Sequence, residues 1–259
     1  MQPYEFTPGS TPLLLSIPHA GTHVPEDIAA DLTDEAARLP DTDWHVDVLY
    51  AFAQDLGAHI IRANYSRLCV DLNRPPDDAP LYTGATTGLF PQVLFDGNPV
   101  LRDGARATRA RFLDTVWQPY HERIRNTLEA LKARHGYAVL FDAHSIRSVI
   151  PRLFEGTLPD FNLGTYDSRS MAGDLETRLA GICRGAEGYN TALNGRFKGG
   201  YTTRHYGAPA HGIHAVQLEL AQKTYMDEFH PFTYRPQRAQ QVQRVLEPFV
   251  RALLDWRPR

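Results

Sequence analysis

The sequence lacks the features that mark secreted, membrane-spanning and disulfide-bonded proteins. Its 259 residues include two cysteines, Cys69 and Cys183, whose separation matches no metal-binding or redox motif. It contains no run of about 18 apolar residues, which a membrane-spanning helix would require. Residues 1–5 lack the basic and apolar segments of a signal peptide. We therefore expect a protein of the cytoplasm, where thiols stay reduced.

An excess of positive charge is also absent. The formal net charge is -3, so the chain offers no basic footprint, and nucleic acid is not an expected partner. Neither a Gly/Ser-rich linker nor an internal repeat divides the chain, and its length suits one α/β domain over residues 1–259. A Gly-x-Ser-x-Gly motif is missing, which argues against a serine hydrolase.

Short apolar runs alternate with segments of helical periodicity. Buried strands are predicted at residues 13–17, 59–62, 68–72, 137–144 and 213–220. Helices are predicted at residues 43–56, 102–134, 168–183 and 235–256. Long loops are predicted at residues 75–99 and 151–165, with a shorter glycine-rich loop at 194–207 that lacks the spacing of a nucleotide-binding loop. This alternation is typical of an α/β fold.

Two histidines follow predicted strands at the points where ligands bind in such folds. His19 comes directly after the strand at residues 13–17, and Asp142 and His144 share one face at the end of the central strand. Open α/β sheets bind ligands at the carboxyl ends of their strands. One such histidine is often a structural residue, but a second one at another strand end favours a metal or anion site.

The acidic segment at residues 41–47 could supply a further ligand. Asp43 is a candidate N-cap of the helix that follows it, and Asp47 lies four residues later on the same predicted helix face. Either carboxylate could provide an oxygen to a metal held by His19 and His144. We favour Asp43 over Asp47.

Glu219 is a polar residue in an otherwise apolar predicted strand. Alternation places it on one face with Ala215 and Gln217, and Val216 and Leu218 on the other. A buried glutamate is costly unless a cation or a catalytic role accompanies it. The alternative is a glutamate at a strand edge that faces water.

Five cationic side chains lie in loops or at strand ends. They are Arg67, Arg74, Arg147, Lys198 and Arg204. Each could be an ordinary surface charge, but at strand ends beside a metal such groups could hold carboxylates. The pattern favours a small anionic ligand.

Seven stretches together resemble the N-formylglutamate amidohydrolase family. They are SIPHAGT at residues 16–22, DTDWHVD at 41–47, SRLCVDLNR at 66–74, DAHSIRS at 142–148, PDFNLGT at 159–165, FKGGYTTRHYG at 197–207 and QLEL at 217–220. The resemblance spans almost the whole chain. It implies hydrolysis of N-formyl-L-glutamate to formate and L-glutamate in histidine degradation. It also implies a phosphorylase/hydrolase-like fold, with a mixed central sheet flanked by helices, as in zinc carboxypeptidases.

The resemblance also implies roles for individual residues. Zinc would be held by His19, Asp43 and His144, and Glu219 would be the general base. The substrate is dianionic, so Arg67, Arg74, Arg147, Lys198 and Arg204 become candidates for binding its two carboxylates. Two alternatives remain: a zinc amidohydrolase acting on another N-acyl amino acid or a peptidoglycan-type amide, and a non-catalytic carboxylate-binding protein on the same fold.

Overall fold

A mixed seven-stranded β-sheet forms the centre of the computed structural model, which describes residues 1–81 and 84–258. The strand order is β1-β3-β2-β4-β7-β5-β6. The strands are β1 (Tyr4–Thr7), β2 (Leu13–Ile17), β3 (His59–Ala63), β4 (Ala138–Ile146), β5 (Phe161–Gly164), β6 (Thr191–Leu193) and β7 (Ile213–Ala221). Strands β3, β2, β4 and β7 run parallel, whereas β1 and β5 pair antiparallel with β3 and β7. The predicted α/β class with a mixed sheet is confirmed.

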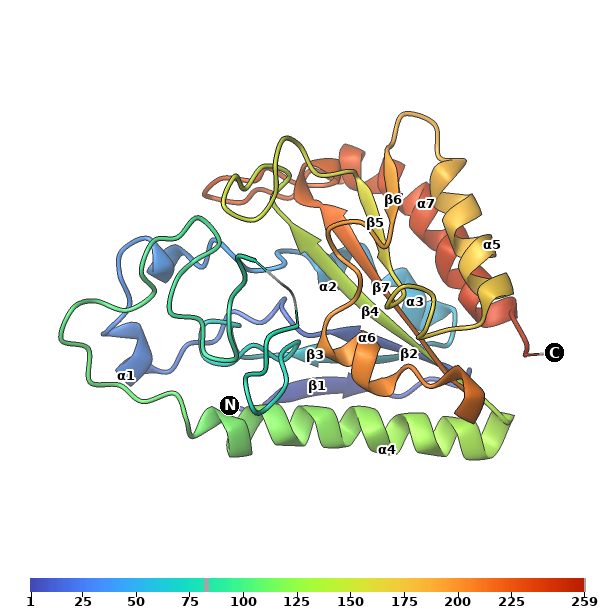
Figure 1. Cartoon of the computed structure of the whole chain (residues 1–259), viewed down its shortest axis with the longest axis horizontal. Helices are drawn as coiled ribbons and strands as arrows, with labels where there is room; N and C mark the ends of the chain where they lie inside the picture. Colours follow the sequence, from blue (N-terminus) through green and yellow to red (C-terminus); the bar gives the residue numbers. More distant parts are fainter. Residues whose placement is uncertain (82–83, 259) are drawn as a thin grey trace.

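Helices cover both faces of this sheet (Figure 1). The long helix α4 (Gln118–His135), preceded by a π-helical turn at Leu113–Trp117, lies on one face together with α6 (Tyr201–Tyr206). Helices α5 (Gly173–Arg184) and α7 (Pro236–Asp255) pack on the opposite face. Shorter helices are α1 (Glu26–Ala29), α2 (Val46–Leu49) and α3 (Phe52–Asp55). None of the described helices is long and apolar enough to cross a membrane.

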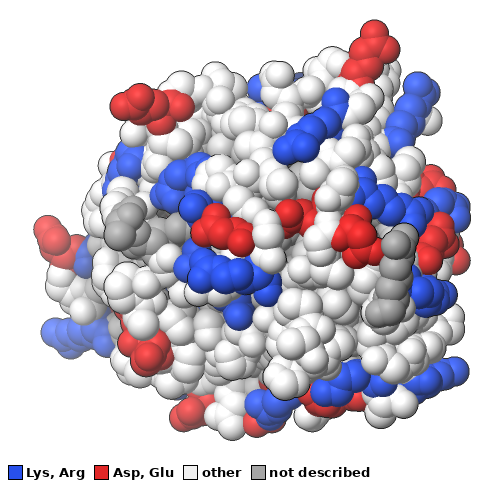
Figure 2. Space-filling view, turned by 45° about the vertical axis from the view of Figure 1, so that its right-hand side comes forward, with Lys and Arg blue, Asp and Glu red and all other residues white. Residues whose placement is uncertain are grey.

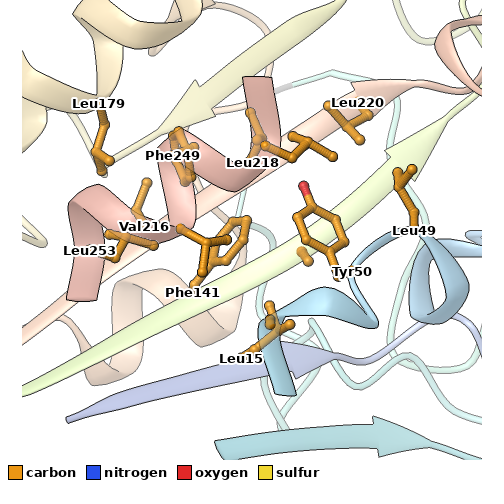
Figure 3. Close-up of a cluster of buried hydrophobic side chains, with 14 of the residues drawn as sticks. Leu15, Leu49, Tyr50, Phe141, Leu179, Val216, Leu218, Leu220, Phe249 and Leu253 are labelled. Carbon is orange, nitrogen blue, oxygen red and sulfur yellow. The ribbon is translucent and has the colours of Figure 1, made fainter. Parts of the chain in front are cut away.

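The apolar core lies in two layers, one on each face of the sheet. Figure 3 shows the layer under α7, where Phe249 and Leu253 pack towards Phe141 of β4 and Val216 of β7. In the other layer, Ile124 and Leu128 of α4 pack with Leu140 of β4. Because side chains alternate along a strand, each central strand contributes to both layers.

The same alternation places polar side chains on the α4 face near the carboxyl ends of the strands. Asp142 and His144 follow Leu140 on this face of β4, and Gln217 and Glu219 follow Ala215 on β7. The sheet thus presents apolar residues in its middle and functional residues at one edge, where open α/β sheets bind ligands.

The surface carries charges of both signs. Figure 2 shows acidic and basic side chains next to one another on one face of the molecule. Exposed ion pairs of the structure include Arg102 with Asp34 at 2.7 Å and Arg111 with Asp27 at 2.6 Å. Exposed pairs of this kind contribute little to stability.

The predicted strands at residues 13–17, 59–62 and 213–220 and the predicted helix at 235–256 are confirmed. The central strand extends further than predicted, to Ile146, because the site residues at its end stay paired with β7. The helix predicted at 168–183 starts later, at Gly173, after three residues with left-handed backbone conformations at 166–168.

The strand predicted at 68–72 is wrong, since this segment forms turns. The hydroxyl of Ser66 accepts a hydrogen bond from the N–H of Leu68, and the carboxylate of Asp71 accepts one from Asn73. Short polar side chains that bond nearby N–H groups compete in this way with the hydrogen bonds of a strand.

The helix predicted at 102–134 is wrong in its first part. Asp31 accepts hydrogen bonds from the N–H groups of Arg106 and Ala107, and Gly104 has a left-handed conformation, so this part is a loop. Pro119 lies in the first turn of α4, next to the π-helical turn at Leu113–Trp117. Two predicted loops contain regular structure, β5 and α6. Part of the predicted loop 75–99, residues 82–83, lies outside the described residues.

Candidate metal centre and active site

Three predicted metal ligands lie together at the carboxyl edge of the sheet. His19, Asp43 and His144 are buried, and one ligand atom from each lies within 4.8 Å of the others. His19 follows β2, and His144 lies in the neighbouring strand β4, so their ring centroids are 4.9 Å apart. Asp43 comes from the loop before α2. The sheet therefore fixes two of these residues, and a loop adds the third.

The two imidazoles make the same kinds of contact, although their planes are tilted by 57°. Nε2 of His19 lies 2.8 Å from Asp71 Oδ1, and Nε2 of His144 lies 2.9 Å from Asp142 Oδ2. Their other nitrogens, the Nδ1 atoms, lie 3.7 Å and 3.0 Å from Asp43 Oδ2. Metal-binding histidines generally donate one ring N–H to a carboxylate and ligate through the other nitrogen. Two Nδ1 atoms and a carboxylate thus converge as a possible ligand set.

The carboxylates behind the histidines are themselves held. Asp71 forms an ion pair with Arg67, whose Nη2 lies 2.6 Å from Asp71 Oδ2. Burial opposes the charge of Asp71, but Arg67 and His19 outweigh it and hold its pKa well below the usual range. Asp142 accepts a hydrogen bond from the hydroxyl of Ser16 at 2.8 Å. Both carboxylates are therefore anchored acceptors for an imidazole N–H.

The two histidines differ in their proton affinity. Burial, reinforced by the charge of Arg67, lowers the pKa of His19, which favours the neutral imidazole that a metal requires. Burial also lowers the pKa of His144, but Asp142 and Asp43 outweigh it and raise that pKa well above its ordinary value. A metal would have to displace this proton, so binding should be pH-dependent.

Asp47, the alternative ligand, lies elsewhere. Its carboxylate is 3.4 Å from Arg62, and it is not part of the buried group. The predicted capping role of Asp43 is wrong: α2 has His45 as its N-cap residue and no side-chain cap. The Oδ2 of Asp43 instead accepts a hydrogen bond from the N–H of Ser145 at 3.2 Å. The local sequence suggests a helix start, but the carboxylate bonds across to β4.

Glu219 lies beside the buried group, directly across from His144 in the register of β7 and β4. It is 6% exposed and lies between two paired strands, so the alternative of a strand-edge glutamate facing water is wrong. Gln217 Nε2 donates a hydrogen bond to its Oε2 at 3.1 Å. Burial, partly offset by His144, raises the pKa of Glu219 to about 8. Its protonation therefore depends on charge in the neighbouring group.

A pocket open to solvent adjoins His19, His144 and Glu219. Two predicted substrate-binding residues, Arg67 and Arg74, line it together with Arg196. Apolar side chains form part of the wall; they are Phe95, Ile146, Leu153 and Phe197. Arg67 lies over the ring of Phe95, with its guanidinium carbon 4.6 Å from the ring centroid. The pocket could hold a small molecule with anionic groups next to the metal-type ligand set.

The other three predicted cations are outside the residues that line this pocket. Arg147 lies 3.6 Å from Asp41, and Lys198 forms a 3.0 Å ion pair with Asp167. Arg204 donates hydrogen bonds to the carbonyls of Gly199 and Leu81. Their roles in substrate binding remain predictions.

Several residues of the site were not predicted from the sequence to be functional. Asn73 Nδ2 lies 3.0 Å from His144 Nε2, and its Oδ1 accepts a hydrogen bond from Thr202. Asp71 and Asn73 follow an apolar run, a position that could have identified them, and Gln217 shares a strand face with Glu219. Arg196 lies in a glycine-rich loop and had no such signal.

The fold and the site define an α/β protein in which a group of potential metal ligands lies at the carboxyl edge of the sheet. A pocket with cationic side chains adjoins this group. The sequence profile of the N-formylglutamate amidohydrolase family matches residues 11–226. The chain therefore belongs to this family, as its motifs predicted.

Known relatives support this assignment. The chain is 55% identical to an N-formylglutamate deformylase of Pseudomonas putida over 254 residues, which cover 97% of this chain and 95% of that protein. It is 54% identical to an N-formylglutamate deformylase of Pseudomonas aeruginosa, with coverage of 97% and 96%.

Solved structures share the fold. An N-formylglutamate amidohydrolase of Ralstonia eutropha is similar with a TM-score of 0.83 at 24% identity, covering 97% of this chain and 98% of that one. A gene product of Agrobacterium tumefaciens is similar with a TM-score of 0.73 at 17% identity, covering 98% and 95%. Each likeness covers at least 95% of both chains.

Proposed function

We propose that this protein hydrolyses N-formyl-L-glutamate to formate and L-glutamate, as a zinc-dependent amidohydrolase of histidine degradation in the cytoplasm. The observation that carries the proposal is the position of Glu219, buried across from His144 at the edge of the pocket. The names of the two Pseudomonas relatives support the substrate. The proposal treats residues 1–259 as one domain, related in fold to zinc carboxypeptidases.

The residues present fit a zinc ion. Zinc in proteins is bound by imidazole nitrogens and carboxylate oxygens, and a catalytic site has three protein ligands. Nδ1 of His19, Nδ1 of His144 and a carboxylate oxygen of Asp43 would be those ligands, each histidine being oriented by a buried carboxylate. When bound, zinc supplies Lewis-acid polarisation of the formyl carbonyl and lowers the pKa of water from 15.7 to about 7.

Glu219 would carry the protons of the reaction. As general base it takes a proton from the water that attacks the formyl carbon, and it then returns a proton to the nitrogen of the departing glutamate. This role requires an ionised carboxylate. Burial raises the pKa of Glu219 to about 8, and positive charge at the neighbouring ligand group would lower it. The ionised form of Glu219, which can act as a base, is thus favoured when a metal occupies the neighbouring site.

The cationic side chains would bind and orient the substrate. N-formyl-L-glutamate has two carboxylates, and Arg67, Arg74 and Arg196 line the pocket. Arginine matches a carboxylate with paired N–H donors. Arg147, Lys198 and Arg204 complete the set that we propose for substrate binding. A hydrogen-bonding or cationic side chain of the pocket would also stabilise the developing charge on the formyl oxygen.

Formate release by the purified protein tests the proposal. We expect turnover of N-formyl-L-glutamate, loss of that turnover after dialysis against a chelator, and recovery when zinc is restored. N-acetyl-L-glutamate and N-formyl-L-leucine are the comparison substrates, because they change the acyl group and the side-chain carboxylate separately. Preference for another N-acyl amino acid, or substrate binding without turnover, would overturn the proposed activity.

A further inference from the structure

The third proposed metal ligand, Asp43, is not held by a helix or strand. The helix α2 begins only at Val46, and the segment before it is a loop. The N–H of Asp43 donates to the carbonyl of His19 at 3.0 Å, which fixes one backbone point. Metal sites lose affinity when a ligand must be ordered on binding, so a loop ligand needs support from neighbouring groups.

Two side chains from the other end of the chain bind the residues on either side of Asp43. Gln222 Nε2 donates to the carbonyl of Thr42 at 3.0 Å. The hydroxyl of Tyr225 donates to the carbonyl of Trp44 at 2.8 Å. Both side chains are buried, and both come from the segment that follows β7, the strand of Glu219.

The same two side chains also meet at Ser145, the residue after His144. The hydroxyl of Tyr225 lies 2.7 Å from Ser145 Oγ, and Gln222 Nε2 lies 3.4 Å from it. The N–H of Ser145 in turn donates to Asp43 Oδ2. One polar cluster therefore holds the loop backbone on both sides of Asp43 and the strand residue that binds its carboxylate.

We propose that Gln222 and Tyr225 are positioning residues that hold the carboxylate of Asp43 ready for the metal. The inference rests on the proposed function, because it takes the His19, Asp43 and His144 group as the metal site. Neither side chain lines the pocket, so neither is expected to contact substrate. Their effect should appear in metal affinity, where loss of an outer hydrogen-bond partner typically costs about 10–100-fold.

Tyr50 offers a matched control for this inference. Tyr50 and Tyr225 are both fully buried. The hydroxyl of Tyr50 has no hydrogen-bond partner among the residues that the structure describes. Replacing either tyrosine by phenylalanine removes one buried hydroxyl, but only Tyr225→Phe removes bonds to the Asp43 loop. Gln222→Met is a second test that removes the amide donors and keeps the length of the side chain.

Zinc affinity of the purified variants, measured by competition with a chelating dye, is the experiment. We expect Tyr225→Phe and Gln222→Met to bind zinc about 10–100-fold more weakly than the wild type, and Tyr50→Phe to bind it equally well. The rise in melting temperature on adding zinc should shrink in the first two variants only, since ligand stabilisation follows affinity.

A purely structural role predicts a different result. In that case the melting temperature falls equally with and without zinc, and the affinity stays at the wild-type value. That outcome, with tight zinc binding by the wild type, overturns the positioning role and leaves the proposed function intact. Absence of zinc binding by the wild type overturns both.

Discussion

Replacing Glu219 by glutamine tests the proposed chemistry most directly. Glutamine has nearly the same shape, and its oxygen can still accept the hydrogen bond that Gln217 donates at 3.1 Å. It cannot take a proton from water at neutral pH. General-base catalysis contributes about 10²–10⁴-fold, or roughly 3–5 kcal/mol of barrier, so formate release should fall by at least 100-fold, about the lower limit of that range. Zinc content should not change.

The same substitution has a predicted signature in stability. A carboxyl whose folded pKa is about 8 and whose unfolded pKa is 4.5 retains its proton in the folded state while the unfolded state loses it. The metal-free wild type should therefore lose stability, relative to Glu219→Gln, as the pH rises from 4.5 to 8. Melting temperatures of both metal-free proteins across this range measure the effect.

Glu176→Gln is a suitable control for these measurements. The carboxylate of Glu176 accepts a hydrogen bond from the hydroxyl of Ser168 at 2.8 Å and does not line the pocket. This variant should lose some stability and keep its turnover. A stable, zinc-loaded Glu219→Gln enzyme with wild-type turnover would refute the assignment of Glu219 as the base.

Four further predictions follow from the same contacts. His144→Ala should lose zinc on dialysis, and elemental analysis showing full occupancy would exclude His144 as a ligand. Asp43→Asn should weaken zinc binding more than Asp47→Asn in a chelator titration, since Asp47 pairs with Arg62; the reverse order would move the ligand. Arg74→Met should raise KM for N-formyl-L-glutamate about 10–100-fold, because a charged hydrogen bond worth about 1.5–3 kcal/mol is lost, and KM for N-formyl-L-leucine much less. Equal changes for both substrates would show that Arg74 does not bind the side-chain carboxylate. Burial lowers the pKa of His121 from 6.5 to about 3, so on acidification the unfolded chain protonates this ring while the folded protein keeps it neutral. The free energy of unfolding should therefore fall by about 2 kcal/mol from pH 7 to pH 5 through this residue. A His121→Gln variant with the same pH dependence of stability as the wild type would contradict this.

The residues held by the sheet could be predicted because apolar runs determine where strands end. The runs at 13–17 and 213–220 correspond to β2 and β7, and both bring polar residues to the same edge. His19, His144 and Glu219 were therefore identifiable from their positions after or within strands. Parallel pairing of the strands then makes them neighbours, whatever the loops do.

The residues held by loops could not be placed in the same way. Asp71 and Asn73 lie in turns whose conformation depends on their own side-chain hydrogen bonds, and Arg196 lies in a loop without periodicity. Asp43 was identified from the sequence, but its position in the structure depends on Gln222 and Tyr225. These two residues lie 179 and 182 positions further along the chain. Contacts at such separation leave no local pattern in a single sequence.

The register between β4 and β7 limits how this protein can change in length. His144 and Glu219 lie directly opposite each other on parallel strands. Inserting one residue earlier in either strand would turn the functional side chain to the face packed under α7, because side chains alternate with a period of two. Insertions in the loops at 84–99 and 151–160 carry no such penalty. New substrate preferences can therefore arise through pocket loops of different length, while the spacing of residues within the two strands stays fixed.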